Sequence, residues 1–379
     1  MTTYDSVTGG VNGTGTASAP GTLATPTQRA RPTMASIARE AGVSVPTVSK
    51  VLNGWSDVAP STRQRVEALL DQRGYVRRSG AGRSAAAPGL VEVVIDSLNN
   101  SWAAALLGGV EAACHQTNLG VSVSVARDSG HGSRPATSWI DRVVARGSRG
   151  VLLALVDVAA TQRARLDRLG IPYVVIDPVA TPQETIYSVG ATNWAGGMSA
   201  TQHLLELGHR RIGVVGGPHD VLCVQARIAG YRAAMARAGV EIPEEYVRYG
   251  ADFGTYTGRD ATMELLDLDQ PPTALFICAD TMALGAYRAL RERGLQVPDD
   301  LSIVGFDDRP ESHWVSPRLT TIRQPLDEMA QAAVSLLVRL MRGETPQSRR
   351  IELATSLLER DSTAPLKGVN HLPAESFRL

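Results

Sequence analysis

The chain has 379 residues, of which 43% are hydrophobic, enough for a sizeable core and about two or three domains. No apolar run approaches the roughly 20 residues of a membrane-spanning helix, and the N-terminal stretch lacks the apolar segment of a secretory signal, so the sequence predicts a cytoplasmic protein without a membrane segment. The three cysteines are far apart and odd in number. They predict buried, reduced thiols rather than a disulfide framework or a zinc site.

The zero net charge conceals an uneven distribution along the chain. Residues 31–83 contain nine basic and four acidic side chains, a net charge of +5, so the part after Arg83 carries −5. A basic segment ahead of a mildly acidic body predicts that this segment alone meets a polyanion. Charge by itself leaves open the alternative of a solvated surface on which the arginines cluster by chance.

Composition divides the chain into segments. The N-terminal segment is rich in Gly, Ser, Thr and Ala, so it cannot bury enough apolar surface to offset the entropy of ordering. The stretch RRSGAGRSAAAPG has three arginines and no large apolar side chain, which is typical of a linker. The expected segments are a disordered tail (1–30), a helical head (31–76), a hinge linker (77–89), a large domain (90–362) and a C-terminal tail (363–379).

The head is predicted to form three short helices around one small core. Thr33 is expected to cap the first helix, which ends at Gly42, and Ser44 to cap the second, which ends at Asn53-Gly54. A third helix is expected over residues 60–74. Because only a very short turn separates the first two, they form a helix-turn-helix, whose second helix enters a major groove.

The second helix of the head carries the residues that would read DNA. Lys50 can donate to O6 and N7 of guanine, whereas Val45 and Pro46 can offer only apolar contact. An ordinary helical hairpin is the alternative, but Ser, Thr and Lys beside an apolar face are the composition that a DNA-reading helix needs. Phosphate contacts that set the register are expected from Ser44, Thr47, Ser49 and Asn53.

Beyond the linker, apolar β-type runs alternate with helical patterns, which predicts parallel sheets buried on both faces. The runs are too many for one small sheet, and a further helical region opens near Asn193. Two similar, doubly wound α/β lobes are therefore predicted, with a ligand between them at the carboxyl ends of the strands. The expected strands are Val91–Asp96, Val121–Ala126, Val151–Val156, Tyr173–Asp177, Arg211–Gly216, Ala274–Cys278 and Leu301–Phe306.

The sequence carries no recognisable enzyme signature. The glycine turn GVVGGPHD follows a predicted strand but is not G-x-G-x-x-G, and no P-loop, HExxH or G-x-S-x-G motif occurs. The seven histidines are scattered. The sequence therefore predicts no catalytic residue, no metal site and no cofactor. A transport-binding protein would share the two lobes but would need an export signal and no basic head.

Several of these motifs together resemble a known family. MASIAREAGVSVPTVSKVLNG, followed by STRQRVEALLDQRGY, looks like the head of the LacI/GalR family of bacterial transcription regulators. HLLELGHRRIGVVGGP, DTMALGAYRALRERGLQVPDDLSIVGFDD and LTTIRQP resemble the family's sugar-binding-protein-like core. The likeness covers about Thr33 to Asp361. It implies a homodimer that holds two heads on a near-palindromic operator, while a small ligand in the cleft changes how the heads are presented.

The resemblance also assigns residues to the cleft. Arg227 and Asp307 stand where related proteins hold sugar hydroxyls, and Arg with Asp can donate to and accept from a polyol. Trp102 stands where an aromatic lines the sugar, and Phe253 is expected on the opposite side. The alternatives are a core or dimer contact for Trp102 and a lobe-to-lobe ion pair for Arg227.

The sequence departs from the family pattern in the cleft and in the hinge. The frequent Asn before D-x-MALG is Ala279, which leaves room for a less polar or larger ligand than a simple hexose, and Asp280 is predicted to cap the next helix. The leucine that the family inserts into the minor groove is replaced by Ser84, and two nearby glycines weaken a hinge helix by up to about 1 kcal/mol each. The linker arginines Arg77 and Arg83 are therefore expected to contact the minor groove or phosphates.

Together these features predict a sequence-specific DNA-binding regulator, a repressor whose operator affinity is set by a mono- or oligosaccharide. The C-terminal end contains no leucine heptad, which predicts a dimer, located in the cytoplasm on the nucleoid. A ligand that orders the hinge would instead make it a corepressor-dependent regulator. From another class, the alternative is a sugar sensor that acts through protein contacts and carries a vestigial head.

Overall fold

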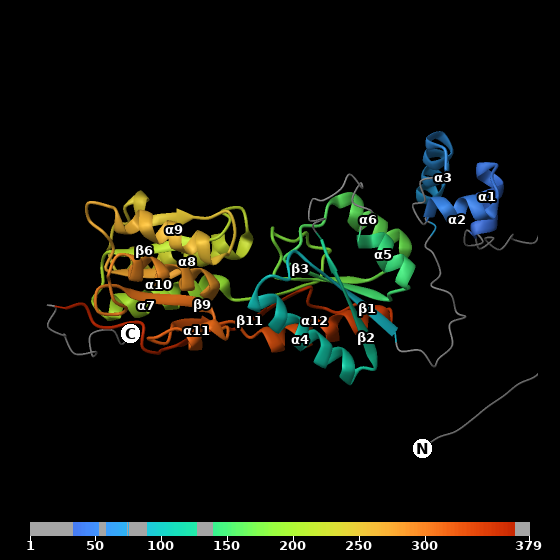
Figure 1. The fold of residues 1–379 in the computed structure, drawn as a ribbon. Helices are drawn as coiled ribbons and strands as arrows, with labels where there is room; N and C mark the ends of the chain where they lie inside the picture. Colours follow the sequence, from blue (N-terminus) through green and yellow to red (C-terminus); the bar gives the residue numbers. More distant parts are fainter. Residues whose placement is uncertain (1–32, 53–57, 74, 76–88, 127–138, 368–379) are drawn as a thin grey trace, which may run out of the picture.

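The computed structural model describes residues 33–52, 58–73, 75, 89–126 and 139–367. Over these ranges the chain forms a small helical head and two α/β lobes, each built on a six-stranded sheet (Figure 1). None of the helices in the described ranges is long and apolar enough to cross a membrane.

The described part of the head contains three helices with one apolar core. Thr33 caps the first as predicted, since its Oγ1 accepts a hydrogen bond from the backbone N–H of Ser36, and Gly42 ends it with a φ of 65°. Ser44 Oγ accepts from the Thr47 N–H at 3.3 Å at the start of the second. The core unites Ile37, Val48, Val66 and Leu70 from all three helices, which are α1 (Met34–Ala41), α2 (Val45–Leu52) and α3 (Pro60–Gln72).

Lobe 1 has the strand order β11-β5-β4-β3-β1-β2, with every neighbouring pair parallel. Helices α4 and α12 cover one face of this sheet, and α5 and α6 cover the other. The strands are β1 (Gly89–Ile95), β2 (Leu119–Val125), β3 (Gly150–Ala154), β4 (Tyr173–Ile176), β5 (Ser188–Ala191) and β11 (Arg350–Leu353); the helices are α4 (Ser101–Gln116), α5 (Trp139–Arg146), α6 (Ala160–Leu169) and α12 (Leu326–Met341).

Lobe 2 repeats the plan with the order β12-β10-β9-β8-β6-β7, in which only β12 runs antiparallel to its neighbour. Helices α7 and α8 pack on one face and α9 and α10 on the other. The strands are β6 (Ile212–Gly216), β7 (Val247–Tyr249), β8 (Ala274–Ile277), β9 (Ser302–Asp307), β10 (Thr320–Arg323) and β12 (Ser356–Leu358); the helices are α7 (Asn193–Glu206), α8 (Leu222–Arg237), α9 (Thr255–Leu266), α10 (Asp280–Glu292), α11 (Glu311–Trp314) and the 3-10 helix η1 (Glu244–Tyr246).

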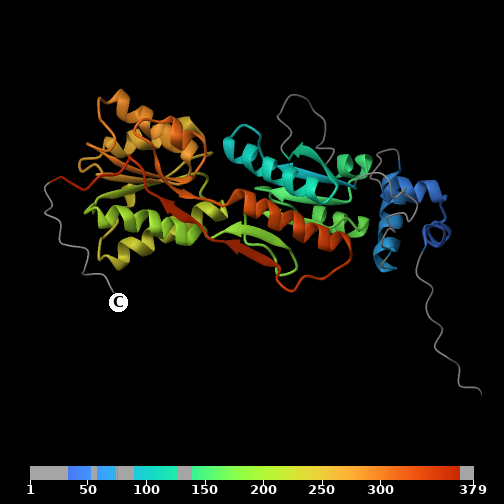
Figure 2. The ribbon, with the colours of Figure 1, turned by 90° about the horizontal axis from the view of Figure 1, so that it is seen from below.

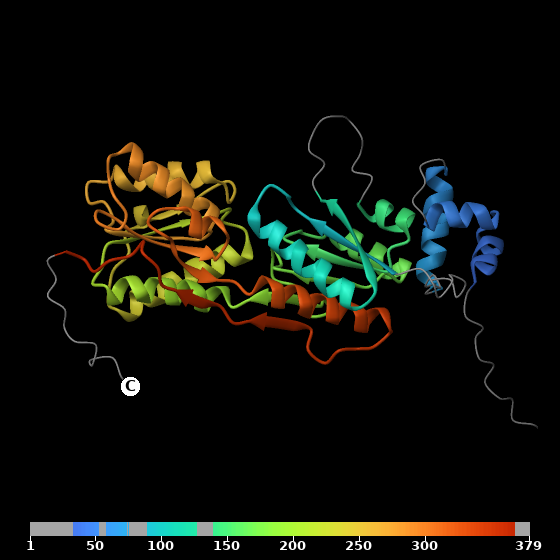
Figure 3. The ribbon, with the colours of Figure 1, turned by 60° about the horizontal axis from the view of Figure 1, so that its bottom comes forward.

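The chain passes between the lobes after β5, after β10 and after β11. Figures 2 and 3 show the last passage as the red strands β11 and β12, which lie in different lobes. Two of these connections are tied together, because the Thr192 N–H donates to the Leu353 carbonyl at 2.9 Å and the Thr355 N–H donates to Thr192 Oγ1 at 3.0 Å. The lobes are thus joined along one side, and the carboxyl ends of their central strands face each other.

All seven predicted strands are present within one or two residues of their expected bounds. The sequence did not indicate β5, β7, β10, β11 and β12, which are short and, in β11 and β12, lie at a sheet edge with exposed side chains. The described chain also continues past the expected end of the large domain at residue 362. Ala364 N–H donates to Ser302 Oγ at 3.1 Å and Leu366 N–H to the Leu207 carbonyl at 2.9 Å, so this segment packs on lobe 2.

Candidate functional site

A cleft of about 370 Å³ lies between the lobes, at the carboxyl ends of β1, β4, β6 and β9. This is the edge at which doubly wound sheets bind ligands, because the strand ends and the following loops leave backbone and side-chain polar groups there. Residues from both lobes line it. Among them are Trp102 from lobe 1 and Phe253, Arg227 and Asp307 from lobe 2.

Arg227 is held rigidly at the base of the cleft. Its Nε donates to Asn193 Oδ1 at 2.8 Å, its Nη1 donates to the Cys278 carbonyl at 2.5 Å, and its guanidinium lies 3.6 Å above the ring centre of Phe306. This position depends on glycine: a Cβ at Gly197 in α7 would overlap the Arg227 carbonyl in α8, so only glycine lets the two helices approach this closely.

Asp307 ends β9 with the residue 7% exposed and a φ of 112°, a strained value for a residue other than glycine. Its Oδ1 lies 3.6 Å from Arg227 Nη1 and has no hydrogen-bond donor among the described residues. Burial raises the pKa of this carboxyl to about 7, although the Arg227 charge opposes the shift. Arg227 and Asp307 therefore form an ion pair inside lobe 2, and not between the lobes, with an acceptor oxygen left for a ligand.

Trp102 belongs both to the lobe 1 core and to the cleft. Its ring packs in the core cluster under α4 and α12, while its Nε1 donates to Gln324 Oε1 at 2.9 Å. Gln324, in the connection after β10, donates in turn to Asp177 Oδ2 at 2.6 Å. Burial raises the pKa of Asp177, which also lines the cleft. The sequence did not single out Gln324 or Asp177, although Asp177 ends a predicted strand, where a ligand-facing residue is expected.

Phe253 lies on the lobe 2 side of the cleft, directly over the turn after β6. A Cβ at Gly217 would lie 2.6 Å from Phe253 Cε1, so the ring rests on a backbone that has no side chain at this point. Trp102 and Phe253 thus supply aromatic surface to the cleft from different lobes.

Polar contacts join the lobes beside the cleft. The buried Glu311 carboxylate accepts from Ser101 Oγ of lobe 1 at 2.5 Å and from Thr281 Oγ1 of lobe 2 at 2.9 Å. The Leu222 N–H at the start of α8 donates to the Val179 carbonyl of lobe 1 at 2.7 Å. Nothing in the sequence pattern marks these contacts, because they join residues that are far apart along the chain.

The prediction that Asp280 caps a helix is wrong. Helix α10 begins at Asp280 itself and its cap position is Ala279. The buried Asp280 carboxyl instead accepts from Thr321 Oγ1 at 2.6 Å and from the Arg309 N–H at 2.8 Å, so it holds the loop after β9 against β10. Burial and the nearby Asp307 carboxyl raise its pKa well above the usual value.

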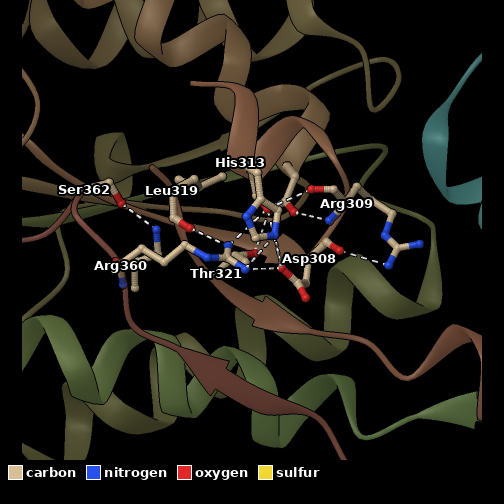
Figure 4. A network of polar contacts seen from close by, with 10 residues as sticks. Asp308, Arg309, His313, Leu319, Thr321, Arg360 and Ser362 are labelled. Atoms are coloured by element: carbon tan, nitrogen blue, oxygen red, sulfur yellow. Dashed lines mark hydrogen bonds and ion pairs between the residues drawn. The ribbon is translucent and has the colours of Figure 1, made fainter. Parts of the chain in front are cut away.

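The same loop is fixed from its other side by the segment after β12 (Figure 4). Arg360 pairs with Asp308 Oδ1 at 2.5 Å, and its Nη1 donates to the Leu319 carbonyl at 2.7 Å. These contacts support the strained conformation of Asp307, one residue before Asp308.

In the head, the side of α2 that faces away from the core has the predicted composition. Val45 is 40% exposed, Ser44 and Pro46 are exposed, and Thr47, Ser49 and Lys50 are half-buried. Val48, Val51 and Leu52 form the inner face. The predictions for Asn53, Arg77, Arg83 and Ser84 lie outside the described residues.

Comparison with known proteins matches both parts of the chain. Residues 33–78 match the lacI family of bacterial regulatory proteins, and residues 201–363 match the periplasmic binding protein-like domain. The HTH-type transcriptional regulator CelR of Thermobifida fusca is 34% identical over 333 residues, 86% of this chain and 96% of CelR. The ribose operon repressor of Escherichia coli K12 is 34% identical over 334 residues, 87% of this chain and 99% of the repressor.

Solved structures agree with the fold. A transcriptional regulator CelR–cellobiose complex has a TM-score of 0.65 and 33% identity, with 88% of this chain and 100% of that chain covered. The lac repressor dimer bound to operator and the anti-inducer ONPF has a TM-score of 0.65 and 28% identity, with 88% and 99% covered. The predicted fold class, and the prediction of a regulator rather than an enzyme, are confirmed by these relatives. The chain belongs to the LacI family of bacterial transcription regulators.

Proposed function

We propose that the protein is a cytoplasmic repressor that binds a near-palindromic operator as a homodimer and releases it when a sugar occupies the cleft. The observation that carries the effector site is the buried Asp307 oxygen without a hydrogen-bond donor, beside Arg227 and between aromatic groups of the two lobes. The CelR–cellobiose complex supports a sugar as the ligand, and the operator-bound lac repressor dimer supports DNA as the partner.

The mechanism that we propose is a shift between two arrangements of the lobes. Trp102 and Asp177 contact the cleft from lobe 1, while Arg227 and Asp307 contact it from lobe 2, so a ligand that touches both sets favours one arrangement. The linker 77–89 connects lobe 1 to the head, and only one arrangement holds both heads at operator spacing. A sugar that bound both arrangements equally would regulate nothing.

For the DNA contacts, we propose that α2 enters the major groove with Val45, Pro46 and Lys50 toward the bases. Ser44, Thr47, Ser49 and Asn53 then bind phosphates, and Arg77 and Arg83 bind the minor groove or phosphates. The exposure of Val45 and Pro46 at the start of α2 supports this orientation.

For the dimer, we propose a face on lobe 2 formed by α9, α10 and the segment after α11. Trp314 is 77% and Tyr256 71% exposed, and such large apolar side chains on a surface mark interaction sites. Between these elements runs a groove lined by Leu284, Tyr287, Leu295, Val315 and Pro317, among others.

The test is fluorescence anisotropy of the full chain on its own upstream DNA, at several salt concentrations and with a panel of sugars. Specific binding with a steep salt dependence, abolished by one sugar, supports the proposal. If the sugar instead tightens operator binding, it acts as a corepressor and not as an inducer. Weak, equal binding to scrambled DNA would contradict operator recognition and favour a sensor that acts through protein contacts.

A further inference from the structure

The ionisable side chains that line the cleft are predominantly acidic. Among the described residues that line it, Asp96, Asp177, Asp252 and Asp307 are acidic, and the basic one is Arg227. Arg227 already donates from Nε to Asn193 and from Nη1 to the Cys278 carbonyl, and its charge is partly offset by the nearby Asp307. Asp307 is more than nine-tenths buried and its Oδ1 has no donor among the described residues, so in its ionised form it can accept a hydrogen bond from a ligand hydroxyl.

Groups of the protein accept hydrogen bonds from N–H groups at the starts of helices around the cleft. In α/β folds, the free N–H groups at the start of a helix after a strand are the usual place for a phosphate. Here Asp252 Oδ1 accepts from the Gly254 N–H at the start of α9, at 2.8 Å, and also from the Thr257 hydroxyl. Asp280 places a carboxyl in the first turn of α10.

Two further helices that begin at the cleft, α4 and α8, each have one N–H taken by a protein oxygen. At the start of α4, Asn100 Oδ1 accepts from the Ala103 N–H at 2.8 Å, and the Glu311 carboxylate lies against Ser101. At the start of α8, the Leu222 N–H is taken by the Val179 carbonyl. At the starts of α4, α8 and α9, protein oxygens thus take N–H groups that a phosphate could use, and the carboxyl groups of Asp280 and Glu311 lie nearby.

We propose that the cleft selects uncharged sugars, whose hydroxyls donate to Asp307, and excludes their phosphate esters and sugar acids. This inference rests on the proposed function, because it concerns the effector of the same cleft. It places the regulator ahead of a kinase reaction: the protein responds to a sugar before phosphorylation and not to the phosphorylated product.

The test is isothermal titration calorimetry of the full chain with matched pairs and controls. The probes are ribose and ribose 5-phosphate, glucose and glucose 6-phosphate, cellobiose, glucuronate and inorganic phosphate. We expect at least one neutral sugar to bind, with a Kd at least about a hundredfold below that of its phosphate or acid. A phosphorylated sugar that binds as tightly as its parent overturns this inference and leaves the sugar-controlled repressor intact. If none of the probes binds, both this inference and the sugar-controlled repressor are overturned.

A variant that removes one charge from the cleft tests whether the carboxylates cause the preference for neutral sugars. Asp252→Asn keeps an oxygen acceptor for the start of α9 but removes one negative charge from the cleft, so the preference for the neutral sugar should narrow by about tenfold. Asp260→Asn is the matched control, because Asp260 lies on α9, the helix that follows Asp252, is paired with Arg259 and does not line the cleft. Equal preference in the wild type and Asp252→Asn would show that the carboxylates do not set the selectivity and would overturn the inference.

Discussion

The folded protein holds Asp307 in an energetically unfavourable environment. Its carboxylate is removed from water, its backbone is strained, and one of its oxygens has no donor among the described residues. The ion pair with Arg227 offsets only part of the desolvation. A group kept under these conditions is typical of a binding site, where the ligand supplies the missing interaction.

The raised pKa of Asp307 makes stability depend on pH in a predictable direction. The pKa of Asp307 rises from 3.8 to about 7 on folding. The contribution of this group to the free energy of unfolding is therefore fully present below about pH 4 and is lost as the pH rises toward 7. Asp307→Asn removes this titration. The free energy of unfolding of the variant, relative to the wild type, should therefore increase between pH 4 and 7, by up to about 1.4 kcal/mol per pH unit.

Urea unfolding of both proteins at pH 5, 6 and 7 measures this difference. Asp361→Asn is the control: Arg318 holds the pKa of the exposed Asp361 below 3.8, so this carboxyl does not titrate between pH 5 and 7 and the profile of the variant should run parallel to that of the wild type. Parallel pH profiles for Asp307→Asn and the wild type would show that Asp307 titrates normally.

At the scale of elements, the close packing of α7 on α8 positions Arg227 and depends on glycine at two points. A Cβ at Gly230 would overlap the Trp194 carbonyl, so Gly230→Ala should separate the helices and lower the free energy of unfolding by about 1–3 kcal/mol. Because Arg227 lies in α8, sugar affinity should fall as well. Gly108→Ala in α4 is the matched control: open space surrounds that position, and alanine should stabilise the helix by about 0.5–1 kcal/mol. Thermal unfolding and sugar titration of both variants distinguish the two outcomes.

The contact between α4 and α11 should couple the lobes energetically. In a double-mutant cycle with Ser101→Ala and Glu311→Ala, we expect a coupling energy of about 1–3 kcal/mol in the free energy of unfolding, because the hydrogen bond joins a hydroxyl to a buried carboxylate. Ser101→Ala combined with Asp361→Ala should be additive within about 0.5 kcal/mol, since Asp361 pairs with Arg318 elsewhere. Additivity in both cycles would mean that the contact does not hold the lobes together.

The elements that the sequence predicted and those that it missed differ physically. Buried central strands such as β3 and β8 are continuous apolar runs, which indicate a strand without further information. Strands β5 and β10, at the connections between lobes, contain glycine or threonine, and β12 has three residues, so no pattern distinguishes them from loops. The site residues differ in the same way: some lie in a local sequence pattern and others do not. Asp307 lies in a recognisable motif, whereas the contacts of Glu311 and Gln324 with lobe 1 are made to partners more than a hundred residues away.

At the scale of the whole molecule, the lobes and the heads are linked by thermodynamic reciprocity. If a sugar weakens operator binding by some factor, operator DNA weakens sugar binding by the same factor. The linkage needs two heads on one operator, so it depends on the proposed dimer face as much as on the cleft. Monomeric protein should bind sugar normally and hold the operator weakly.

Leu284→Asp tests this dependence, because Leu284 is half-buried in the groove of the proposed face and a charge there would be desolvated on association. We expect the variant to sediment as a monomer, to bind sugar with unchanged affinity and to bind the operator at least about a hundredfold more weakly, since one head loses the contribution of the second half-site. Trp194→Asp is the matched control: Trp194 is also a large exposed side chain, but it lies on α7, on the opposite face of the lobe 2 sheet. A Leu284→Asp protein that remains dimeric while Trp194→Asp dissociates would move the interface to the α7 side. If the variant loses operator binding but keeps sugar binding, the contact that makes the two heads act together lies at α10 and not at the cleft.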